Sequence, residues 1–504
     1  MNWLDRTVAF VSPLSAVKRV RARHALKVAL AYEGARNTRA TSGWITGGTS
    51  ANSEIGTGLE GLRNRSRDLV RNNAWCSRAL EEIVANVVGF GIVGQAKTGS
   101  DSLDKLLDAK WDRFVEECDA DGQLDFYGLQ DLVERTRNES GECLVRLRSR
   151  RLEDGFAVPL QLQVMEPDHL DLSKTGMVGG NAVIQGVEYD PIGRRVAYWL
   201  FPTHPGDVTM GLGVRRFESV RTPAANILHI YRKLRPGQGR GVPVFAPIIA
   251  KARDVDELEE AFLVRKKLEA CFAAFRTTPD GADSAPIGVE ATANTNGVMV
   301  ESFEPGMIVK TPPGESIEFV DPTSSGGMIE HMRLELHAIA AGIGVTYQGM
   351  TGDLTQVNYS SYRAGRISVN RLYESIQWKT MIPQFCNSTR RRFVDAVSIQ
   401  APQVSGMYGA EWSPPRFESV DPYKDAVADQ LEVRSGFTTL PEVIRRRGYD
   451  PRKQIAAIAE TNKQLDEAGL VLDSDPRKVA KSGAAQMDSS SGGGSNGRPG
   501  DDEA

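Results

Sequence analysis

The segment spanning residues 141–150 reads Gly-Glu-Cys-Leu-Val-Arg-Leu-Arg-Ser-Arg. Its apolar residues Cys143, Val145 and Leu147 occupy every second position, a period typical of a strand with one buried face. Short hydrophobic runs separated by turn-forming residues continue from there to about residue 235. The region 141–235 therefore predicts a β-rich layer, and the helical patterns on both sides of it place the chain in the α+β class.

The flanking regions carry apolar residues near a 3.6-residue period, and Gly89 is placed to end the first helical stretch. The stretch 244–275, about 30 residues, would form a helix of about 45 Å and suggests a structural spine. Pro383 is expected to kink or interrupt the last long stretch. The stretches expected to be helical are 59–88, 101–118, 244–275, 328–343 and 361–397, with further helices after Trp412 and a helix start at Thr439-Leu440-Pro441-Glu442.

Other segments are expected to be irregular. Residues 41–58 are rich in Gly, Thr and Ser, which predicts a loop. The proline-rich stretch 277–323 favours short strands and turns, and residues 347–360 form a polar, glycine-bearing loop between two helical stretches. Residues 14–33 suit a basic amphipathic helix or arm, whereas the Ser/Gly-rich tail from about residue 482 is expected to be disordered.

The composition is that of a folded protein with several domains, with 504 residues, 40% of them hydrophobic and 25% charged. Its net charge of −4 excludes a chain that binds nucleic acid tightly over its whole surface. Five widely spaced cysteines without a Cys-x-x-Cys pair favour reduced thiols. No apolar run approaches the roughly 20 residues of a membrane span, and no signal peptide is evident, so a soluble protein made in the cytosol is expected.

The sequence gives no positive support for catalysis. Residues 89–94, Gly-Phe-Gly-Ile-Val-Gly, match a dinucleotide-binding pattern by letter, but a helical pattern precedes them where that chemistry needs a strand. No P-loop occurs, and His331 and His337 miss the spacing of a zinc site. We therefore predict no catalytic residue, no cofactor and no metal. An alternative is a nucleic-acid-processing enzyme that holds a divalent metal through Glu166 and Asp168.

A series of short motifs runs in order along nearly the whole chain. They are Asn2-Trp3-Leu4-Asp5-Arg6, Tyr32-Glu33-Gly34-Ala35, Leu62-Arg63-Asn64-Arg65-Ser66-Arg67-Asp68-Leu69-Val70-Arg71-Asn72-Asn73, Asn86-Val87-Val88-Gly89-Phe90-Gly91-Ile92, Glu139-Ser140-Gly141-Glu142, Glu166-Pro167-Asp168-His169-Leu170, Gly186-Val187-Glu188-Tyr189-Asp190, Arg235-Pro236-Gly237-Gln238-Gly239-Arg240-Gly241-Val242-Pro243, Ala340-Ala341-Gly342-Ile343-Gly344-Val345-Thr346-Tyr347 and Asp353-Leu354-Thr355-Gln356-Val357-Asn358-Tyr359-Ser360-Ser361. In content and order this series resembles the lambda-type portal proteins of tailed phages, over about residues 2–470. Gln348 is a small departure, because the family usually has Glu there.

The resemblance implies a ring of twelve subunits at one capsid vertex, with a channel through which double-stranded DNA is packaged and ejected. The partners it implies are further copies of the chain, DNA in transit, the terminase large subunit, the major capsid protein and scaffold, and head-tail connector or adaptor proteins. It places the protein in the virion and, during assembly, in the host cytoplasm. The implied layout is a basic N-terminal arm (1–40), an α+β wing (41–245 and 361–410), stem helices (246–276 and 326–345), a small β-rich clip (277–325), a tunnel loop (346–360), crown helices (411–475) and a disordered tail (476–504).

Two groups of residues are the candidate site that the resemblance implies. The tunnel loop offers neutral hydrogen-bonding groups that could touch phosphates without a net attraction, namely Gln348, Thr355, Gln356, Asn358, Tyr359 and Ser360. Four arginines, Arg63, Arg65, Arg67 and Arg71, are candidates for a subunit interface or for positions near DNA. A capsid adaptor or scaffold that forms no channel remains the other alternative.

Overall fold

The computed structural model describes residues 47–207, 218–271, 275–277, 292–293, 299–300, 316–318, 326–355, 357–417 and 421–472. The chain divides into two compact units, residues 1–54 and 55–504. The predicted N-terminal arm (1–40), the predicted disordered tail (476–504) and most of the predicted clip lie outside the described residues.

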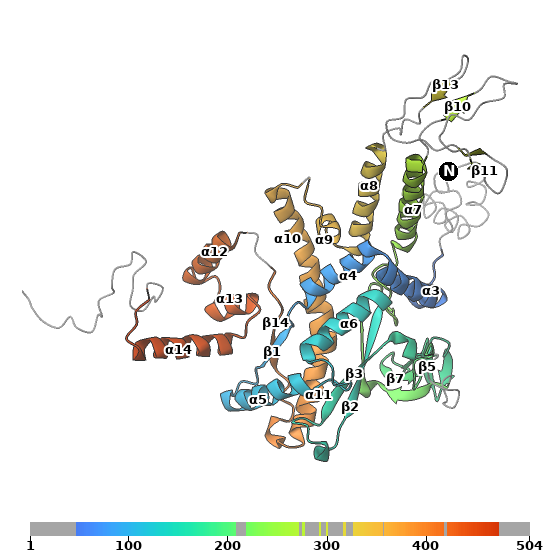
Figure 1. Cartoon of the computed structure of the whole chain (residues 1–504). Helices are drawn as coiled ribbons and strands as arrows, with labels where there is room; N and C mark the ends of the chain where they lie inside the picture. Colours follow the sequence, from blue (N-terminus) through green and yellow to red (C-terminus); the bar gives the residue numbers. More distant parts are fainter. Residues whose placement is uncertain are drawn as a thin grey trace, which may run out of the picture. The chain divides into compact units, whose positions relative to one another are not determined.

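Helices and strands alternate irregularly along the chain, which confirms the α+β class (Figure 1). The α-helices are α3 (Ala51–Asn72), α4 (Ala74–Val87), α5 (Asp101–Glu117), α6 (Phe126–Ser140), α7 (Ile249–Cys271), α8 (Gly326–Ile343), α9 (Tyr347–Thr351), α10 (Tyr359–Ile376), α11 (Asn387–Ser398), α12 (Pro422–Arg434), α13 (Leu440–Arg446) and α14 (Pro451–Glu467). A π-helical segment, η5 (Gln377–Cys386), joins α10 to α11.

The strands form small antiparallel sheets, and two of them make up the predicted β-rich layer. The central sheet has the order β3 (Leu160–Met165), β2 (Glu142–Ser149) and β9 (Ile227–Tyr231), and the second has the order β4 (Gly176–Val178), β5 (Asn181–Ile184), β6 (Val187–Tyr189), β7 (Arg195–Leu200) and β8 (Val220–Pro223). Three two-stranded pairs are β1 (Val93–Ala96) with β14 (Ala410–Ser413), β10 (Phe275–Thr277) with β13 (Ser316–Glu318), and β11 (Thr292–Ala293) with β12 (Met299–Val300).

The two faces of β2 explain how these sheets pack. Cys143, Val145 and Leu147 point into the main core with helices α5, α6 and α11. Leu144, on the opposite face, lies in a smaller core shared with the five-stranded sheet. Burial of each such side chain contributes about 1.5–3 kcal/mol, so β2 is fixed from both sides at its N-terminal half.

Aromatic rings dominate the centre of the main core. Trp111 of α5 lies 5.1 Å from Phe126 and 4.9 Å from Phe393, both nearly edge-to-face. Phe126 in turn stacks on Phe385 of η5 at 5.4 Å between ring centroids. Helices separated by some 270 residues in the chain are thereby locked into one core. Cys76, Cys118, Cys143 and Cys386 are unpaired and buried.

The chain between residues 359 and 398 is helical throughout, as expected, and Pro383 lies within its π-helical part. Proline has no N–H to donate and its ring clashes with the preceding turn, so the helix widens there instead of continuing regularly. In the same segment, the Gln384 side chain accepts from Tyr231 N (2.9 Å) and donates to Tyr231 O (3.1 Å). This helix therefore covers the free edge of the central sheet at β9.

Three expectations about helix boundaries are wrong. Residues 51–58 belong to α3 and not to a loop. The stretch 59–88 is two helices, because the Asn73 side chain accepts from Cys76 N at 2.8 Å and starts α4 anew. The long stretch 244–275 does not become helical until Ile249, because Pro243 and Pro247 lie before the start of α7, whose 23 residues span about 35 Å. The helices predicted at 101–118, 328–343 and from Thr439 are confirmed within one or two residues.

Candidate functional site

The segment 346–360 connects α8 to α10 and contains more structure than the predicted loop. Its first part is the one-turn helix α9, where Thr346 Oγ1 accepts from Gly349 N at 3.0 Å. Gly352, with a φ of 72°, ends this turn in the left-handed region that glycine enters without strain. Helix α9 packs against α4 (Figure 1). The first part of the segment is therefore held in place by its own hydrogen bonds and by its packing against α4.

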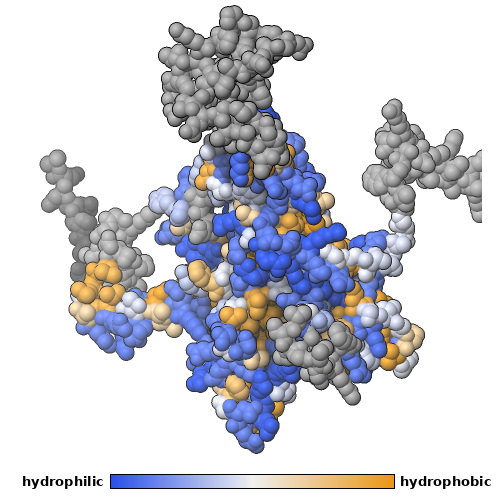
Figure 2. All heavy atoms as spheres, turned by 45° about the vertical axis from the view of Figure 1, so that its right-hand side comes forward, coloured by the Kyte–Doolittle hydropathy of each residue, from blue (hydrophilic) through white to orange (hydrophobic). Residues whose placement is uncertain are grey.

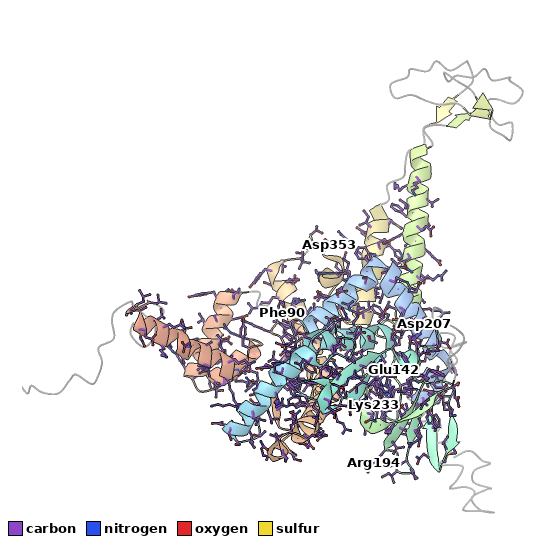
Figure 3. The ribbon with its side chains drawn as sticks, turned by 60° about the horizontal axis from the view of Figure 1, so that its bottom comes forward. Phe90, Glu142, Arg194, Asp207, Lys233 and Asp353 are labelled. Atoms are coloured by element: carbon purple, nitrogen blue, oxygen red, sulfur yellow. The ribbon has the colours of Figure 1, made fainter. Side chains whose placement is uncertain are left out.

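Asp353 organises the second part of this segment (Figure 3). Its carboxylate accepts from Thr355 N (3.0 Å), Thr355 Oγ1 (2.6 Å) and Tyr347 Oη (3.2 Å), and Arg333 lies 3.4 Å away. These hydrogen bonds, foremost that from the Thr355 hydroxyl, lower the pKa of Asp353. The Thr355 hydroxyl is thus engaged inside the segment. This hydrogen bond stabilises the turn at residues 353–355, so the hydroxyl donor is already used within the chain.

The other predicted loop residues have different surroundings. Gln348 is half-buried in α9. Asn358 starts α10 by accepting from Ser361 N at 2.8 Å, and Tyr359 and Ser360 are exposed in its first turn. Gln356 lies outside the described residues. The residues 346–360 include no Lys or Arg, so the exposed part of the segment offers neutral groups.

The base of the segment is tied to its neighbouring helices by polar contacts. Arg366 of α10 pairs with Glu82 of α4 at 2.6 Å, and a second guanidinium nitrogen donates to Asn86 Oδ1 at 3.0 Å. His337 of α8 stacks on Tyr347 with ring centroids 4.1 Å apart, which is a packing role and not metal ligation. The segment thus presents exposed side chains from a rigid base, with Leu354 61% and Tyr359 52% exposed.

A second feature is a fully buried carboxylate, Glu142, at the start of β2 (Figure 3). It accepts from Arg240 at 2.6–3.1 Å, Arg63 at 3.1 Å, His229 Nε2 at 2.9 Å and Gly241 N at 2.9 Å. Burial by itself raises the pKa of Glu142, but the Arg240 charge and the His229 hydrogen bond hold that pKa well below its usual range. Glu142 is therefore an anion at neutral pH.

The donors to Glu142 come from distant parts of the chain. Arg63 belongs to α3, His229 to β9, and Arg240 to the glycine-rich segment before α7. Arg240 is 1% exposed and also donates to the backbone carbonyl of Gln185 at 2.7 Å. Burial lowers the pKa of His229, so its ring is neutral when it donates to the carboxylate. This cluster fastens a helix, the central sheet and the approach to α7 together.

The cluster continues to Glu166 and Asp168, the carboxylates of the predicted metal-dependent alternative. With His204 they form the one group of three potential ligands within the described residues. Arg67 already lies 2.8 Å from Glu166 and 2.6 Å from Asp168. A guanidinium between both carboxylates supplies the positive charge that a metal ion would bring, so the arrangement fits an ion pair better than a metal centre.

The four predicted arginines separate into two kinds. Arg63 is 4% exposed and Arg67 is half-buried, and both are engaged in the charge cluster within their own chain. Both side chains are therefore held by carboxylates of their own chain, and a place at a subunit interface or near DNA stays a prediction for them. Arg65 and Arg71 are exposed, and Arg71 lies 3.4 Å from Asp68. An exposed interface or DNA-proximal role remains a prediction for these two.

The glycine pattern at 89–94 forms a turn from α4 into β1. A helix thus precedes it and a strand follows, the reverse of the order that a dinucleotide site needs. Gly91, with a φ of 114°, leaves no room for a β-carbon, which would lie 2.1 Å from Tyr127. Its glycines serve chain reversal and close packing.

A family model described as "Phage portal protein, lambda family" matches residues 37–377. The chain belongs to the lambda family of phage portal proteins. The matched range contains both the Glu142 cluster and the whole segment 346–360 of this portal chain. It ends where η5 begins.

Curated relatives carry the same family name. The chain is similar to a probable portal protein of Halomonas phage phiHAP-1, with 27% identity over 87% of each chain. It is also similar to portal protein B of Escherichia phage lambda (21% identity, 60% of this chain and 62% of that one) and to the portal protein of Escherichia phage N15 (21%, 64% and 66%).

Among solved structures, the portal chain resembles a subunit in the virion of a native gene transfer agent particle, with a TM-score of 0.42, 15% identity, and 80% of this chain and 95% of that chain covered. A second similar structure is an HK97-family phage portal protein from Corynebacterium diphtheriae, with a TM-score of 0.30, 11% identity, and coverage of 69% and 94%. None of the described helices of the portal chain is both long and apolar enough to cross a membrane.

Reasoning from the sequence missed Glu142, His229 and Asp353 as organising residues. Glu142 directly precedes the apolar run Cys143-Leu144-Val145, and a lone carboxylate in such a position signals a buried partner. Arg240, its strongest partner, lies in one of the motifs that carry the family resemblance. Asp353 also begins one of those motifs, but an aspartate in a polar loop is ordinary, so its residue type by itself did not indicate an organising role.

Proposed function

We propose that this portal chain is one subunit of a twelve-membered ring at one vertex of a phage capsid, and that double-stranded DNA passes through the centre of the ring. Membership of the portal family supports the ring. The observation that supports passage of DNA is the segment 346–360, which connects α8 to α10. A channel must not hold DNA that is moving through it. Lys and Arg side chains bind DNA phosphates strongly, because this contact releases the counterions condensed on the DNA. A segment without Lys or Arg on a fixed base suits such sliding contact.

In this proposal α7 and α8, which run side by side (Figure 1), are the stem. Lys251 and Glu335 form an ion pair between them. The sheets and α3–α6 belong to the wing together with α10, η5 and α11, and α12–α14 are the crown. The short strands between α7 and α8 belong to the clip. Helices α8 and α10 would hold the tunnel loop, 346–360, toward the channel.

The partners proposed for the ring are the terminase large subunit during packaging, the major capsid protein and scaffold during assembly, and head-tail connector proteins afterwards. The proposed location is the capsid vertex, reached from the host cytoplasm. The portal family is an assembly component, and we propose no catalytic role for this chain. DNA incubated with the pure protein and Mg²⁺ or Mn²⁺ is accordingly expected to stay intact.

Native mass spectrometry with negative-stain imaging tests the ring. Twelve copies of the 55.1 kDa chain give a species of about 660 kDa with ring-shaped end views. A well-folded monomer or dimer would overturn the proposal and favour a capsid adaptor that forms no channel.

Packaging of DNA into proheads tests the loop. Ser360 is exposed and accepts substitution without loss of a contact, so Ser360→Lys adds one cation per subunit to the proposed channel. We expect packaging to slow at low salt and to recover as salt screens the new charge. Ser360→Ala is the matched control and should package like the wild type. Equal rates for both variants at every salt concentration would remove 346–360 from the channel.

A further inference from the structure

Three arginines form a row on one face of β2 and of the residue that directly follows it. Arg146, Arg148 and Arg150 alternate along the end of the strand, so their side chains share the face opposite the main core and stand about 6.6 Å apart. All three are partly exposed. At the start of this same face Leu144 is covered by the five-stranded sheet, but that cover ends before the row.

The neighbouring strand β3 orients two of these side chains. Arg148 Nε donates to Gln163 Oε1 at 2.9 Å, and Arg150 Nε donates to Gln161 Oε1 at 2.8 Å. Gln161 is itself fixed, because its amide nitrogen donates to two backbone carbonyl oxygens at 2.9 and 3.0 Å. Arg148 and Arg150 therefore lean diagonally across the sheet in the same way, and neither uses its two terminal nitrogens in these bonds.

Within the part of the chain that the structure describes, the row has no counter-charge. Among the described residues, no carboxylate lies within 4 Å of any of the three guanidiniums, and their terminal nitrogens form no hydrogen bond. Arg146 lies diagonally opposite Met165, which offers it no such acceptor. Burial and then the like charges of Arg146 and Arg150 lower the pKa of Arg148. An external anion would relieve this repulsion.

We propose that this arginine row binds the sugar-phosphate backbone of duplex DNA. Evenly spaced, pre-oriented guanidiniums suit a polyanion whose charges repeat along a line, and free guanidinium edges suit phosphate oxygens. The side chains next to the row on β3 are glutamines, whereas a protein interface usually centres on a buried apolar or aromatic anchor. The inference rests on the proposed function only in taking DNA as the polyanion.

This contact differs in kind from that of the tunnel loop, 346–360, which contains no cation. Three phosphates bound per subunit would make the interaction salt-dependent, with no preference for base sequence. The arginine row would thus bind DNA electrostatically, whereas the tunnel loop would contact it without a net charge attraction.

Fluorescence anisotropy of a labelled DNA duplex with the full-length protein, over a range of salt concentrations, tests the proposal. The test variant is Arg146→Gln, Arg148→Gln, Arg150→Gln. The control variant is Lys105→Gln, Arg194→Gln, Arg434→Gln, which removes the same charge from scattered exposed positions; Arg194 stands at the β6–β7 turn (Figure 3). We expect the test variant alone to bind at least about tenfold more weakly at low salt, and its log–log salt slope to fall by about 2.7.

A third variant, Arg146→Lys, Arg148→Lys, Arg150→Lys, keeps the positive charge. It shows whether a loss of DNA binding in the glutamine variant comes from the lost charge or from misfolding. It should retain most of the salt slope while binding more weakly, because lysine lacks the oriented fork. Equal losses in the test and control variants would overturn the proposal, because net charge alone would then explain binding. Undiminished DNA binding with lost binding of a poly-glutamate peptide would also overturn it, in favour of an acidic protein partner.

Native mass spectrometry of the same samples separates this inference from the proposed function. Failure of the wild type to form a ring counts against the portal assignment even if the row binds DNA. A wild-type ring that does not bind duplex DNA at low salt counts against the row alone.

Discussion

Replacement of Glu142 by glutamine tests the role of the buried charge cluster. The substitution keeps the shape of the side chain but removes the negative charge that Arg240 and Arg63 contact at 2.6–3.1 Å. It also turns an amide N–H₂ toward groups that are themselves donors. Loss of one partner from a buried ion pair costs about 3–5 kcal/mol, because the remaining charge stays buried without compensation. We expect Glu142→Gln to lie in the upper half of that range.

Thermal unfolding, followed by intrinsic fluorescence, measures this effect. For the compact unit 55–504, an unfolding entropy of about 2.1 cal/mol/K per residue makes 1 kcal/mol correspond to about 1 °C, so Glu142→Gln should lower Tm by about 4–5 °C. The matched control is Glu81→Gln, which breaks a half-exposed pair with Arg135 that has similar distances of 2.7 and 2.8 Å. That pair should contribute about 0.2–1 kcal/mol. Equal Tm shifts for the two variants would refute the reasoning.

The pH dependence of this difference has a definite sign. The folded-state pKa of Glu142 is lowered, so its stabilising charge is fully present above the unfolded value of about 4.3 and is lost as pH falls through the folded value. The Tm difference between the wild type and Glu142→Gln should therefore stay constant from pH 7 to about pH 5. It should narrow only under more acidic conditions.

The remaining predictions concern a turn, a histidine and the C-terminal helices. Gly141→Ala should destabilise the protein by more than the roughly 1–2 kcal/mol expected for Gly193→Ala in urea unfolding: both glycines have a positive φ, but a β-carbon at Gly141 would lie 2.5 Å from a backbone carbon, whereas Gly193 faces open space. Burial lowers the pKa of His229, so the stability that His229 contributes is present above pH 6.5 and is lost as pH falls through its folded pKa. His229→Gln should therefore make Tm decline less steeply between pH 7 and pH 5. An unchanged slope of Tm against pH would contradict this. Arg452 of α14 pairs at 2.8 Å with Asp104 of α5, whose side chain is 3% exposed, so Arg452→Gln should speed hydrogen exchange in α14 about tenfold while leaving the central sheet protected.

Local sequence patterns predicted most of the regular elements. Alternating residues around Val145 indicated β2, and helical periods indicated α5 and α8, because one-sided burial leaves its period in the sequence. The helix start at Thr439 was equally readable, since a threonine there can accept from Glu442 N and Pro441 has no N–H to leave unpaired. The order of the motifs predicted the family, which the family match over residues 37–377 confirms.

Boundaries were predicted less well where a single side chain decided them. The break between α3 and α4 depends on the cap that Asn73 provides, and asparagine within a helical period is not distinctive. The turn of α9 depends likewise on Thr346 and Gly352. Such short-range hydrogen bonds compete with helix continuation by only about 1 kcal/mol, so the sequence leaves both outcomes open.

The sequence by itself determined the class of fold, the position of most helices and the absence of cations from residues 346–360, because these are properties of composition and period. Only the tertiary structure decided what the charged residues do. Arg63 and Arg67 appeared in the sequence as members of one arginine series, yet folding buries Arg63 against Glu142 and half-buries Arg67 against Asp168, from elements some 80–100 residues away. An ion pair depends on distance in space and on exclusion of water, and neither is written in the spacing of residues along a chain.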